Sequence, residues 1–538
     1  MPSLAPSFAT APLSVSMSRM LRILSVVALV CLTAFPHMAA AQTVQASQLP
    51  LVSIADVDRD GLGDASVETK RLRLILSSKT GDFSVYYLKG VNYEENLFPP
   101  VLMDAGYPFA TDTVAPFSAA IGSQTFNTHG YTIDVVEKTN DRLVVTATYN
   151  NVTPEARARG EIGLVKRYTF NPEGYVFEIA YVLNNLGSQL IEVADSHQNG
   201  LTITYGPGIF LDPFNPSSIL ALKPEGHDTF DSPEDLLKKS GTGGYTGIGL
   251  KTTYFCMLLD AKQQVKLNAR AFPVKSDDAR KKEFKGEVIS VSIPSFTLKP
   301  QEGKTFSFQV YYGPKLLDEL LSIKRDSVTD YGFLSTMLLR ILQFFNEIYP
   351  NFGMSIVFLT IVVRLLLYPL TLKSTKSMAQ VQKLQPLVQD LKDRHRDEPQ
   401  KFNEEVLKLY QKHNVNPLGG CLPMLLQLPI LIALYNTINI AVELRKMPFM
   451  WMADLSKADP YLILPIAIAA LMYYQQGTSN MDPQQQQMMA FMPMFMFVIT
   501  WSLPAGLLVY WFTSSIIGII QQIQANRIMS AAKEKITP

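Results

Sequence analysis

The sequence predicts two kinds of structure in one chain, an all-β sandwich domain followed by an α-helical membrane bundle. Runs that alternate apolar and polar residues dominate residues 42–330, which is the pattern of half-buried strands. After residue 350, several apolar segments are long enough to cross a bilayer core of about 30 Å. A stretch rich in lysine and arginine follows the first of these segments and marks the cytoplasmic side by the positive-inside rule.

The composition excludes several classes of protein. The chain has 538 residues and a formal net charge of +1, so it is too long for one domain and lacks the basic excess of a nucleic-acid binder. Its three cysteines, Cys31, Cys256 and Cys421, provide neither a disulfide framework in the β region nor the spacing of a metal site. No Ser/His/Asp motif, phosphate loop or HExxH zinc motif is present, so we predict neither an enzyme nor a cofactor.

The N-terminus carries an export signal. Residues 1–20 are predicted as a cytoplasmic stretch, and Arg19 and Arg22 precede an apolar run that ends in small residues near position 41. This three-part pattern is typical of a cleavable secretory signal. The same segment, 21–41, would form a membrane anchor if it were retained. Both a five-span and a six-span protein therefore remain open, and in either case the β region is exported.

Turn clusters such as KTGD, NPEG and KPQEG separate strands such as RLVVTATY and YVFEIAYVL within residues 42–330, which favours a β-sandwich. Near its start, DVDRDGLGD resembles the first part of an EF-hand calcium loop. The twelfth position of that loop is Val67 rather than a glutamate, which favours an acidic linker. A metal site remains a weak alternative, and its candidate ligands are Asp56, Asp58, Asp60 and Asp64.

The helical region begins with an amphipathic segment, 331–350, which predicts a helix lying in the membrane interface. Two amphipathic stripes in the basic stretch predict a cytoplasmic helical hairpin. Leu503-Pro504-Ala505-Gly506 interrupts the last apolar block, which predicts two short spans. The predicted order is span 351–372, hairpin 373–416, span 417–442, periplasmic loop 443–459, span 460–476, cytoplasmic loop 477–487, spans 488–502 and 505–524, and cytoplasmic tail 525–538.

Arg364 is the only charged residue of the apolar segment 354–372. An arginine at the centre of a membrane helix costs at least ~2.5–3.5 kcal/mol and is a functional-site candidate for that reason. Thr360, Tyr368 and Thr371 lie four residues before it and four and seven residues after it, on the same helix face. We therefore expect this face to contact protein or water rather than lipid.

None of the predicted spans contains an Asp or Glu to pair with Arg364. In one interpretation, Arg364 lies in a water-filled cavity and attracts an anion that arrives from elsewhere. In the other, it snorkels to the inner headgroups near Lys373, about 13 Å along the helix. Uncharged polar side chains available to line a cavity are Gln427, Tyr510, Thr513 and Ser514.

Methionine and phenylalanine residues fill much of the predicted span 488–502. Methionine is adaptable and common at surfaces that accept varied apolar partners. Ordinary packing or lipid exposure explains the same composition equally well.

Five stretches of the helical region together resemble the YidC family of membrane protein insertases. They are IVVRLLLYPLT (361–371), NPLGGCLPMLLQLPILIALYNTI (416–438), VELRKMPFMWMADLS (442–456), DPQQQQMMAFMP (482–493) and LPAGLLVYWFTSSIIGIIQQ (503–522). In the β region, TFSFQVYYGPKLLDEL (305–320) is similar to the end of the periplasmic sandwich of Gram-negative members. The acidic stretch near residue 60 is not part of the resemblance.

The resemblance implies an inner-membrane protein that inserts and folds other membrane proteins, alone or with the Sec translocon. It implies a groove that is open to the cytoplasm and to lipid but closed on the outer side. Arg364 matches the groove arginine, which transiently holds the acidic or polar tail of a client. The predicted groove residues are Thr360, Arg364, Tyr368, Gln427, Tyr510 and Trp511.

The resemblance also implies an apolar path for the client. Residues 424–433 and 492–501 match two spans along which a client segment slides into lipid. The predicted slide residues are Met424, Leu425, Ile430, Met492, Phe495 and Met496. The hairpin matches a cytoplasmic element that engages clients, ribosomes or a targeting factor.

Two other classes of function are alternatives. A small-solute transporter or channel with a periplasmic ligand-binding domain would need buried ion-coupling residues, which the predicted spans lack. A sugar-processing enzyme with a mutarotase-like sandwich would need a convergent histidine and carboxylate pair, and the chain has six histidines with no paired motif. Fold analogy alone carries little weight for that class.

Overall fold

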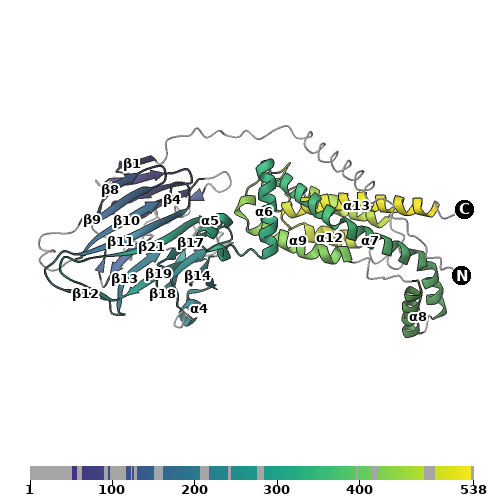
Figure 1. The fold of residues 1–538 in the computed structure, drawn as a ribbon, viewed down its shortest axis with the longest axis horizontal. Coiled ribbons are helices and arrows are strands. Elements are labelled where there is room, and N and C mark those ends of the chain that lie inside the picture. The colour runs from purple at the N-terminus through teal and green to yellow at the C-terminus, as the bar shows by residue number, and fades with distance from the viewer. Residues whose placement is uncertain are drawn as a thin grey trace, which may run out of the picture. The chain divides into compact units, whose positions relative to one another are not determined.

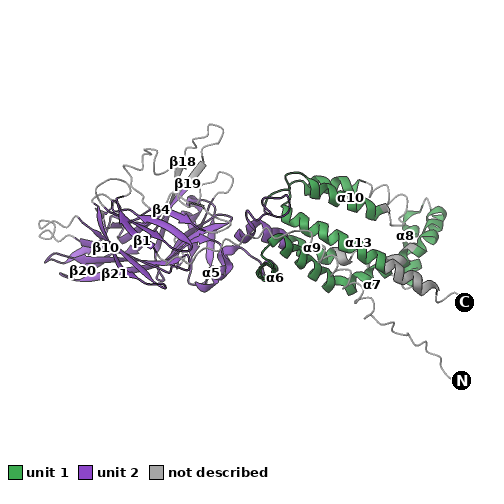
Figure 2. Cartoon of the chain, turned by 90° about the horizontal axis from the view of Figure 1, so that it is seen from above, with its two compact units in different colours: residues 1–45, 337–432, 457–538 green, residues 46–336, 433–456 purple. Residues whose placement is uncertain are grey.

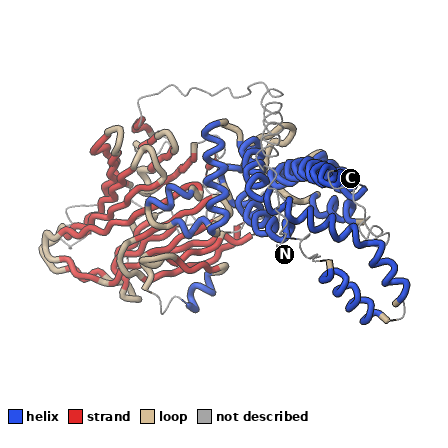
Figure 3. The backbone as a smooth tube through the Cα atoms, turned by 45° about the vertical axis from the view of Figure 1, so that its right-hand side comes forward, coloured by secondary structure: helices blue, strands red, loops and turns tan. Residues whose placement is uncertain are grey.

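The computed structural model describes residues 51–56, 63–89, 95–96, 117–122, 124–126, 130–150, 162–205, 217–239, 244–274, 284–395, 398–413, 422–477 and 491–534. The predicted export segment 21–41 lies outside the described residues. The chain divides into two compact units, which Figure 2 colours separately. The β unit comprises residues 46–336 and 433–456, and the helical unit comprises residues 1–45, 337–432 and 457–538. Strands gather in the β unit and long helices in the helical unit (Figure 3).

The largest sheet of the β unit has nine strands in the order β15-β14-β16-β17-β21-β11-β10-β9-β8. Figure 1 labels its strands from β8 through β11 and β21 to β17. All of its neighbouring strands are antiparallel. The strands are β8 (Tyr131–Lys138), β9 (Leu143–Tyr149), β10 (Ile162–Phe170), β11 (Val176–Asn185), β14 (Ser218–Leu222), β15 (His227–Phe230), β16 (Gly247–Lys251), β17 (Phe255–Asp260) and β21 (Gly303–Pro314).

Three smaller sheets complete the β unit. The first five-stranded sheet has β1 (Leu51–Ala55), β2 (Asp64–Glu68), β3 (Leu72–Leu76), β4 (Phe83–Leu88) and β5 (Glu95–Asn96) in chain order. The second, in the order β18-β19-β13-β6-β7, has β6 (Ser118–Ile121), β7 (Gln124–Thr125), β13 (Asn199–Tyr205), β18 (Lys266–Val274) and β19 (Phe284–Pro294). A short pair joins β12 (Ile191–Val193) to β20 (Phe296–Leu298), and α4 (Pro233–Lys239) lies between β15 and β16 in the chain.

Aromatic side chains join the sheets into one core. The ring of Tyr86 on β4 stacks on that of Tyr312 on β21, with centroids 4.3 Å apart, and its hydroxyl donates to the Tyr312 carbonyl oxygen at 2.8 Å. Tyr205 on β13 donates its hydroxyl to that of Tyr312 at 2.7 Å. Both five-stranded sheets thus pack on the nine-stranded sheet, and the predicted all-β sandwich is confirmed.

A buried ion pair crosses this core. Lys166 on β10 and Asp82 beside β4 lie 2.6 Å apart, and both side chains are 0% exposed. Tyr168 donates to the same Asp82 oxygen, Oδ1, at 3.2 Å, and Lys166 also donates to the Thr80 carbonyl oxygen at 3.2 Å. The second carboxylate oxygen of Asp82 is buried without a hydrogen-bond partner among the described residues.

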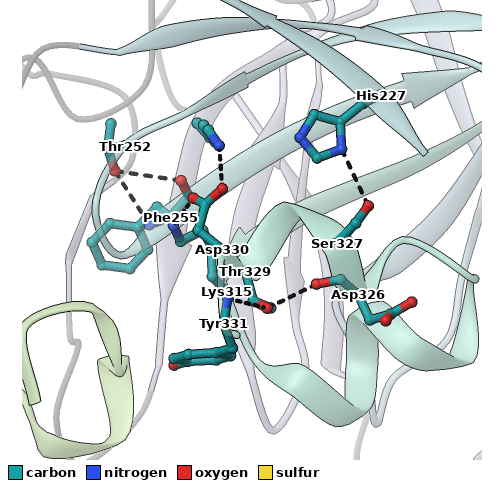
Figure 4. A network of polar contacts seen from close by, with 10 residues as sticks. His227, Thr252, Phe255, Lys315, Asp326, Ser327, Thr329, Asp330 and Tyr331 are labelled. Carbon is teal, nitrogen blue, oxygen red and sulfur yellow. Dashed lines mark hydrogen bonds and ion pairs between the residues drawn. The ribbon is translucent and has the colours of Figure 1, made fainter. Parts of the chain in front are cut away.

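The segment after β21 is attached to the sandwich by ionic contacts, and Figure 4 shows the network around Asp330 from close by. It contains α5 (Leu317–Ser322) and the short helix η3 (Asp326–Thr329). Asp330 accepts from Lys251 at 2.7 Å and from Lys315 at 3.4 Å. Arg325 pairs with Asp260 and donates to two carbonyl oxygens of the β14–β15 turn. The chain therefore leaves the sandwich at a fixed point.

A second segment of the β unit comes from far along the chain. Residues 441–456 include the short helix η5 (Val442–Leu444), and Arg445 lies over the rings of Tyr254 and Phe255 at 5.1 and 5.5 Å. Such cation–π contacts stabilise by about 0.5–2 kcal/mol. The loop predicted at 443–459 therefore contacts the sandwich through Arg445.

The remaining helices are α6 (Phe333–Ile348), α7 (Phe352–Arg394), α8 (Pro399–Lys412), α9 (Leu422–Ile440), α10 (Ile463–Gly477), α12 (Met492–Thr500) and α13 (Ala505–Glu534). Helix α7 begins where the Asn351 side chain accepts from the Met354 amide at 2.9 Å, an N-cap. It then runs without a break through Pro369 and Pro386. The predicted span 351–372 and the first arm of the predicted hairpin are therefore one helix.

Within the described residues, two segments are long and apolar enough to cross a membrane by length and composition, Phe352–Ser377 and Ala505–Gln524. Leu425–Ile440 and Ile463–Gln476 are shorter apolar helices. The helical membrane bundle predicted beside the sandwich is confirmed as a fold class, and the number of spans stays a prediction.

Candidate functional site in the helical unit

The helix face predicted around Arg364 packs on α13. Tyr368 is buried against Ile517 of α13, in a cluster that includes Ile361 and Leu365. Thr360 is fully buried, and its hydroxyl donates to the Ile356 carbonyl oxygen one turn earlier at 2.7 Å. The hydroxyl of Thr360 is thus satisfied within α7. This face contacts protein, as the polar stripe predicts.

Arg364 is held at two points by α13. Its Nε donates to the Ser514 hydroxyl at 2.8 Å, and Gln521 donates to its carbonyl oxygen at 3.4 Å. Arg364 makes no ion pair with any residue that the structure describes. Its terminal nitrogens, Nη1 and Nη2, approach the position where a side chain would begin at Gly518. The guanidinium is therefore fixed through Nε, while its terminal edge has no counter-charge among the described residues.

Tyr510 and Gln427 form the neighbouring polar contact. Gln427 on α9 donates to the hydroxyl of Tyr510 on α13, and the Tyr510 side chain is buried. Trp511 is half-buried at the next position of α13. The predicted residues Arg364, Tyr368 and Tyr510 thus lie together where α7 packs on α13. Gln427 of α9 is linked to them by its hydrogen bond with Tyr510.

Two residues of this site, Gly518 and Gln521, are not among the predicted groove residues. Both lie on the α13 face that carries Tyr510 and Ser514, at successive helical turns. That spacing is the signal that identifies them, because it extends the polar face of α13 past Ser514.

The predicted slide residues differ in exposure. Leu425 on α9 is 54% exposed, and Ile430 is half-buried. On α12, Phe495 is 58% exposed, Met492 is also exposed, and Met496 is half-buried. The side chain of Met424 lies outside the described residues. Large apolar side chains are therefore exposed on both helices.

Known proteins share this combination of a sandwich and a helical unit. The family model described as "60Kd inner membrane protein" matches residues 344–533, and the model of the YidC periplasmic domain matches residues 64–344. A membrane protein insertase YidC of Geobacter sulfurreducens is 33% identical over 391 residues, which is 70% of each chain. That of Tolumonas auensis is 33% identical over 401 residues, or 71% of each.

The chain belongs to the YidC family of membrane protein insertases. A solved structure of an active YidC insertase, with its first transmembrane domain resolved, covers 94% of this chain at 18% identity and a TM-score of 0.38. Membership places the chain in the inner membrane, with the β unit as the YidC periplasmic domain, as predicted.

Backbone contacts join the start of α13 to the segment that precedes α10. The amide of Ala505, at the start of α13, donates to the Lys457 carbonyl oxygen at 2.7 Å, and Ala458 forms a β-bridge with Pro504. The Asp459 carboxylate accepts from the Leu464 amide at 2.8 Å and so caps α10. The turn between α12 and α13 is thereby fixed to the start of α10.

The opposite end of the helical unit carries the charged hairpin. The C-terminal part of α7 contacts α8, in which no residue is fully buried. Exposed ion pairs occur along α8, including Lys408 with Glu405 at 2.9 Å. The side chain of Lys408 holds the pKa of Glu405 below its ordinary value by donating a hydrogen bond to it. Surface pairs of this kind contribute little to stability.

The acidic stretch near residue 60 is described only in part. Asp64 begins β2 and is buried, and its Oδ1 accepts from the amide and hydroxyl of Ser78 at 2.7 and 3.0 Å. Asp58 and Asp60 lie outside the described residues. Among the described residues, no three His, Cys, Asp or Glu side chains gather as a metal site, Asp56 and Asp64 included.

Proposed function

We propose that the chain inserts and folds integral membrane proteins in the inner membrane by holding a polar flank of the client near Arg364. The relatives that share 70% of the chain are named membrane protein insertases. The observation that carries the proposal is the guanidinium of Arg364, which is fixed by Ser514 but lacks an ion pair with any described residue. A cation of this kind within a membrane helix attracts an anion supplied from outside the bundle.

The site supports holding and release rather than covalent chemistry. A carboxylate on the client would gain a charge-assisted hydrogen bond with Arg364, which contributes about 1.5–3 kcal/mol. The apolar segment of the client would meanwhile gain about 25 cal/mol per Å² as it leaves water. We propose that Thr360, Tyr368, Gln427, Tyr510 and Trp511 form the groove around this cation. No catalytic step or cofactor is required.

We also propose an exit path and an entry side. Exposed apolar side chains on α9 and α12, including Leu425 and Phe495, would guide the client segment into lipid. The backbone contacts between Ala458 and Pro504 support a groove that is closed at its periplasmic end. The charged hairpin of α7 and α8 would engage the ribosome or a targeting factor, and the Sec translocon would act on larger clients.

Insertion assays on two matched clients test the role of Arg364. Cells depleted of their own insertase would express the full chain and a single-span client whose short translocated tail carries either Glu or Gln. We expect Arg364→Ala to reduce insertion of the Glu client about tenfold or more, because a charged hydrogen bond is lost. Arg364→Lys keeps the charge, and we expect partial insertion from it.

The exposed Arg142 of the β unit, which lies 3.4 Å from Glu137, provides a control for arginine loss. Arg142→Ala should insert both clients as the parent does. Normal insertion of the Glu client by Arg364→Ala would refute the proposed role of the arginine. Solute flux through the purified chain in liposomes would instead favour a transporter.

A further inference from the structure

The guanidinium of Arg364 offers a ligand only one of its two hydrogen-bonding edges. A carboxylate can bind an arginine side-on, through Nε and one terminal nitrogen, or end-on, through Nη1 and Nη2. Ser514 already accepts from Nε at 2.8 Å, which obstructs the side-on geometry. Neither terminal nitrogen makes a hydrogen bond to any described residue. The end-on edge is therefore the one available to an incoming anion.

The backbone of Gly518 lies next to that edge. A Cβ atom built on Gly518 would be 3.7 Å from Nη2, 3.8 Å from Nη1 and 3.9 Å from Cζ of Arg364. These nearly equal distances place the added atom obliquely over the terminal end of the planar guanidinium. A longer side chain at this position would cover the terminal edge, and the glycine leaves it uncovered.

Three residues on one face of α13, each about one helical turn from the next, surround Arg364. Ser514 fixes Nε, Gly518 leaves space one turn later, and Gln521 donates to the Arg364 carbonyl oxygen at 3.4 Å. Because a partly buried arginine has many rotamers, its direction depends on such contacts. The α13 face therefore determines both where the guanidinium points and which edge is open.

We propose that Gly518 is a specificity-determining position that admits a client carboxylate to the Nη1–Nη2 edge of Arg364 in an end-on geometry. This inference rests on the proposed function, since it assumes that Arg364 receives a client anion. It goes further by naming the ligand class, the edge it binds and the residue that leaves room for it. Gly518 makes no bond to the carboxylate; it acts by leaving the terminal edge of Arg364 uncovered.

Side-chain size at position 518 should then control selectivity. Contacts of 3.7–3.9 Å are ordinary van der Waals distances, so alanine fits without displacing Arg364. Leucine adds branched carbon atoms over the terminal edge and favours the helix more than glycine does. Ser515, half-buried on the same helix turn, provides a matched control because leucine there adds similar bulk to α13 at a position about 60° around the helix axis from Gly518.

The test compares the Glu and Gln clients in insertase-depleted cells that express the full chain. We expect Gly518→Leu to reduce insertion of the Glu client about tenfold, because the charged hydrogen bond is blocked. The Gln client should lose much less insertion than the Glu client with Gly518→Leu, and Gly518→Ala should cost the Glu client less than Gly518→Leu does. Both clients should change by less than about twofold with Ser515→Leu. Immunoblots of the membrane fraction report the amount of each variant.

Equal losses for both clients with Gly518→Leu would overturn the proposal, because they would show a packing role. The same selectivity from Ser515→Leu would also overturn it. If Arg364→Ala inserts both clients normally, the proposed function itself fails. If Arg364→Ala is selective and Gly518→Leu is not, only the present inference fails.

A cross-linking measurement keeps the proposal testable if Gly518→Leu does not accumulate. Gly518→Cys would be placed in a chain whose own cysteines are replaced by serine, with a client cysteine next to the client glutamate. We expect a disulfide on oxidation of a stalled client, stronger than from Ser515→Cys. Equal or weaker cross-linking from position 518 would contradict a carboxylate lying over Gly518.

A lipid phosphate on Arg364 would give the same cross-linking with and without the client glutamate, and this result would also overturn the proposal.

Discussion

Lys166 and Arg364 are basic residues removed from bulk water in the two units, and only Lys166 has its own carboxylate. Lys166 is fully buried and lies 2.6 Å from Asp82, with the ring of Tyr131 5.1 Å away. Arg364 is partly buried and donates to the uncharged hydroxyl of Ser514. The first cation is satisfied within the fold, whereas the second has no anion among the described residues.

This difference separates two uses of a buried charge. Burial raises the pKa of Asp82 and lowers that of Lys166 because each charged form is desolvated, and their attraction opposes both effects. The pair is thus self-contained, and its loss is expected to affect folding. Arg364 has no comparable internal partner, so its loss is expected to affect binding. Each expectation can be tested separately.

The largest effect on stability is expected when the ion pair of the sandwich is broken on one side. Lys166→Met leaves Asp82 buried without a cation, which should destabilise the β unit by about 3–5 kcal/mol. Hydrogen exchange of the β10 amides, measured in the full chain in detergent, reports this loss. The double variant Lys166→Met/Asp82→Leu should regain most of it, because no uncompensated charge remains. A double variant as unstable as the single one would show that packing, rather than charge, is responsible.

In contrast, removing the cation of the helical unit should leave folding almost unchanged. Arg364→Leu removes a desolvated charge and one hydrogen bond to Ser514, two effects of opposite sign that we expect to cancel within about 1 kcal/mol. Thermal unfolding of a chain that carries Trp451→Phe, followed by the fluorescence of the remaining Trp501 and Trp511, measures the change in stability. Unfolding many degrees lower than in the parent would show that Arg364 is structural and would remove the contrast with Lys166.

The two units also differ in how much of them the sequence predicts. Alternation locates the strands well, as in β8, where the exposed Thr132 and Asp134 alternate with the buried Tyr131 and Ile133. Arg364 is predicted as a candidate site from the sequence because charge within an apolar segment is a local property. Both predictions depend only on residues close together in the chain.

Long-range partners could not be predicted in the same way. Lys166 and Asp82 are 84 residues apart, and Arg364 and Ser514 are 150 residues apart. Which residue of α13 meets Nε depends on how α7 and α13 pack, and hydrophobic patterns do not specify that register. Gly518 and Gln521 continue the helical spacing of Tyr510 and Ser514, but whether that face packs on Arg364 depends on the same register. The unbroken α7 was missed because two patterns, apolar and then amphipathic, occupy one helix.

The smallest expected effect concerns His227, whose protonation the fold disfavours. Its Nδ1 lies 3.2 Å from the Ser327 hydroxyl in the network of Figure 4. Partial burial, and then the nearby Lys251, lower the pKa of His227 from its ordinary value of 6.5. Arg325 acts in the same direction, while Asp330 and Asp228 oppose it.

The sign of the pH dependence follows from that direction. Well above pH 6.5, His227 is neutral in both states, so it contributes nothing to the pH dependence of stability there. As the pH falls from 6.5 through the lower folded pKa, the unfolded chain binds the proton first and stability is lost. We expect the β unit of the parent to lose more stability between pH 7.5 and pH 5 than that of His227→Gln, measured by hydrogen exchange in β14 and β15. Equal losses would mean that His227 takes up its proton as readily in the folded chain as in the unfolded chain. The fold would then not oppose a positive charge on His227.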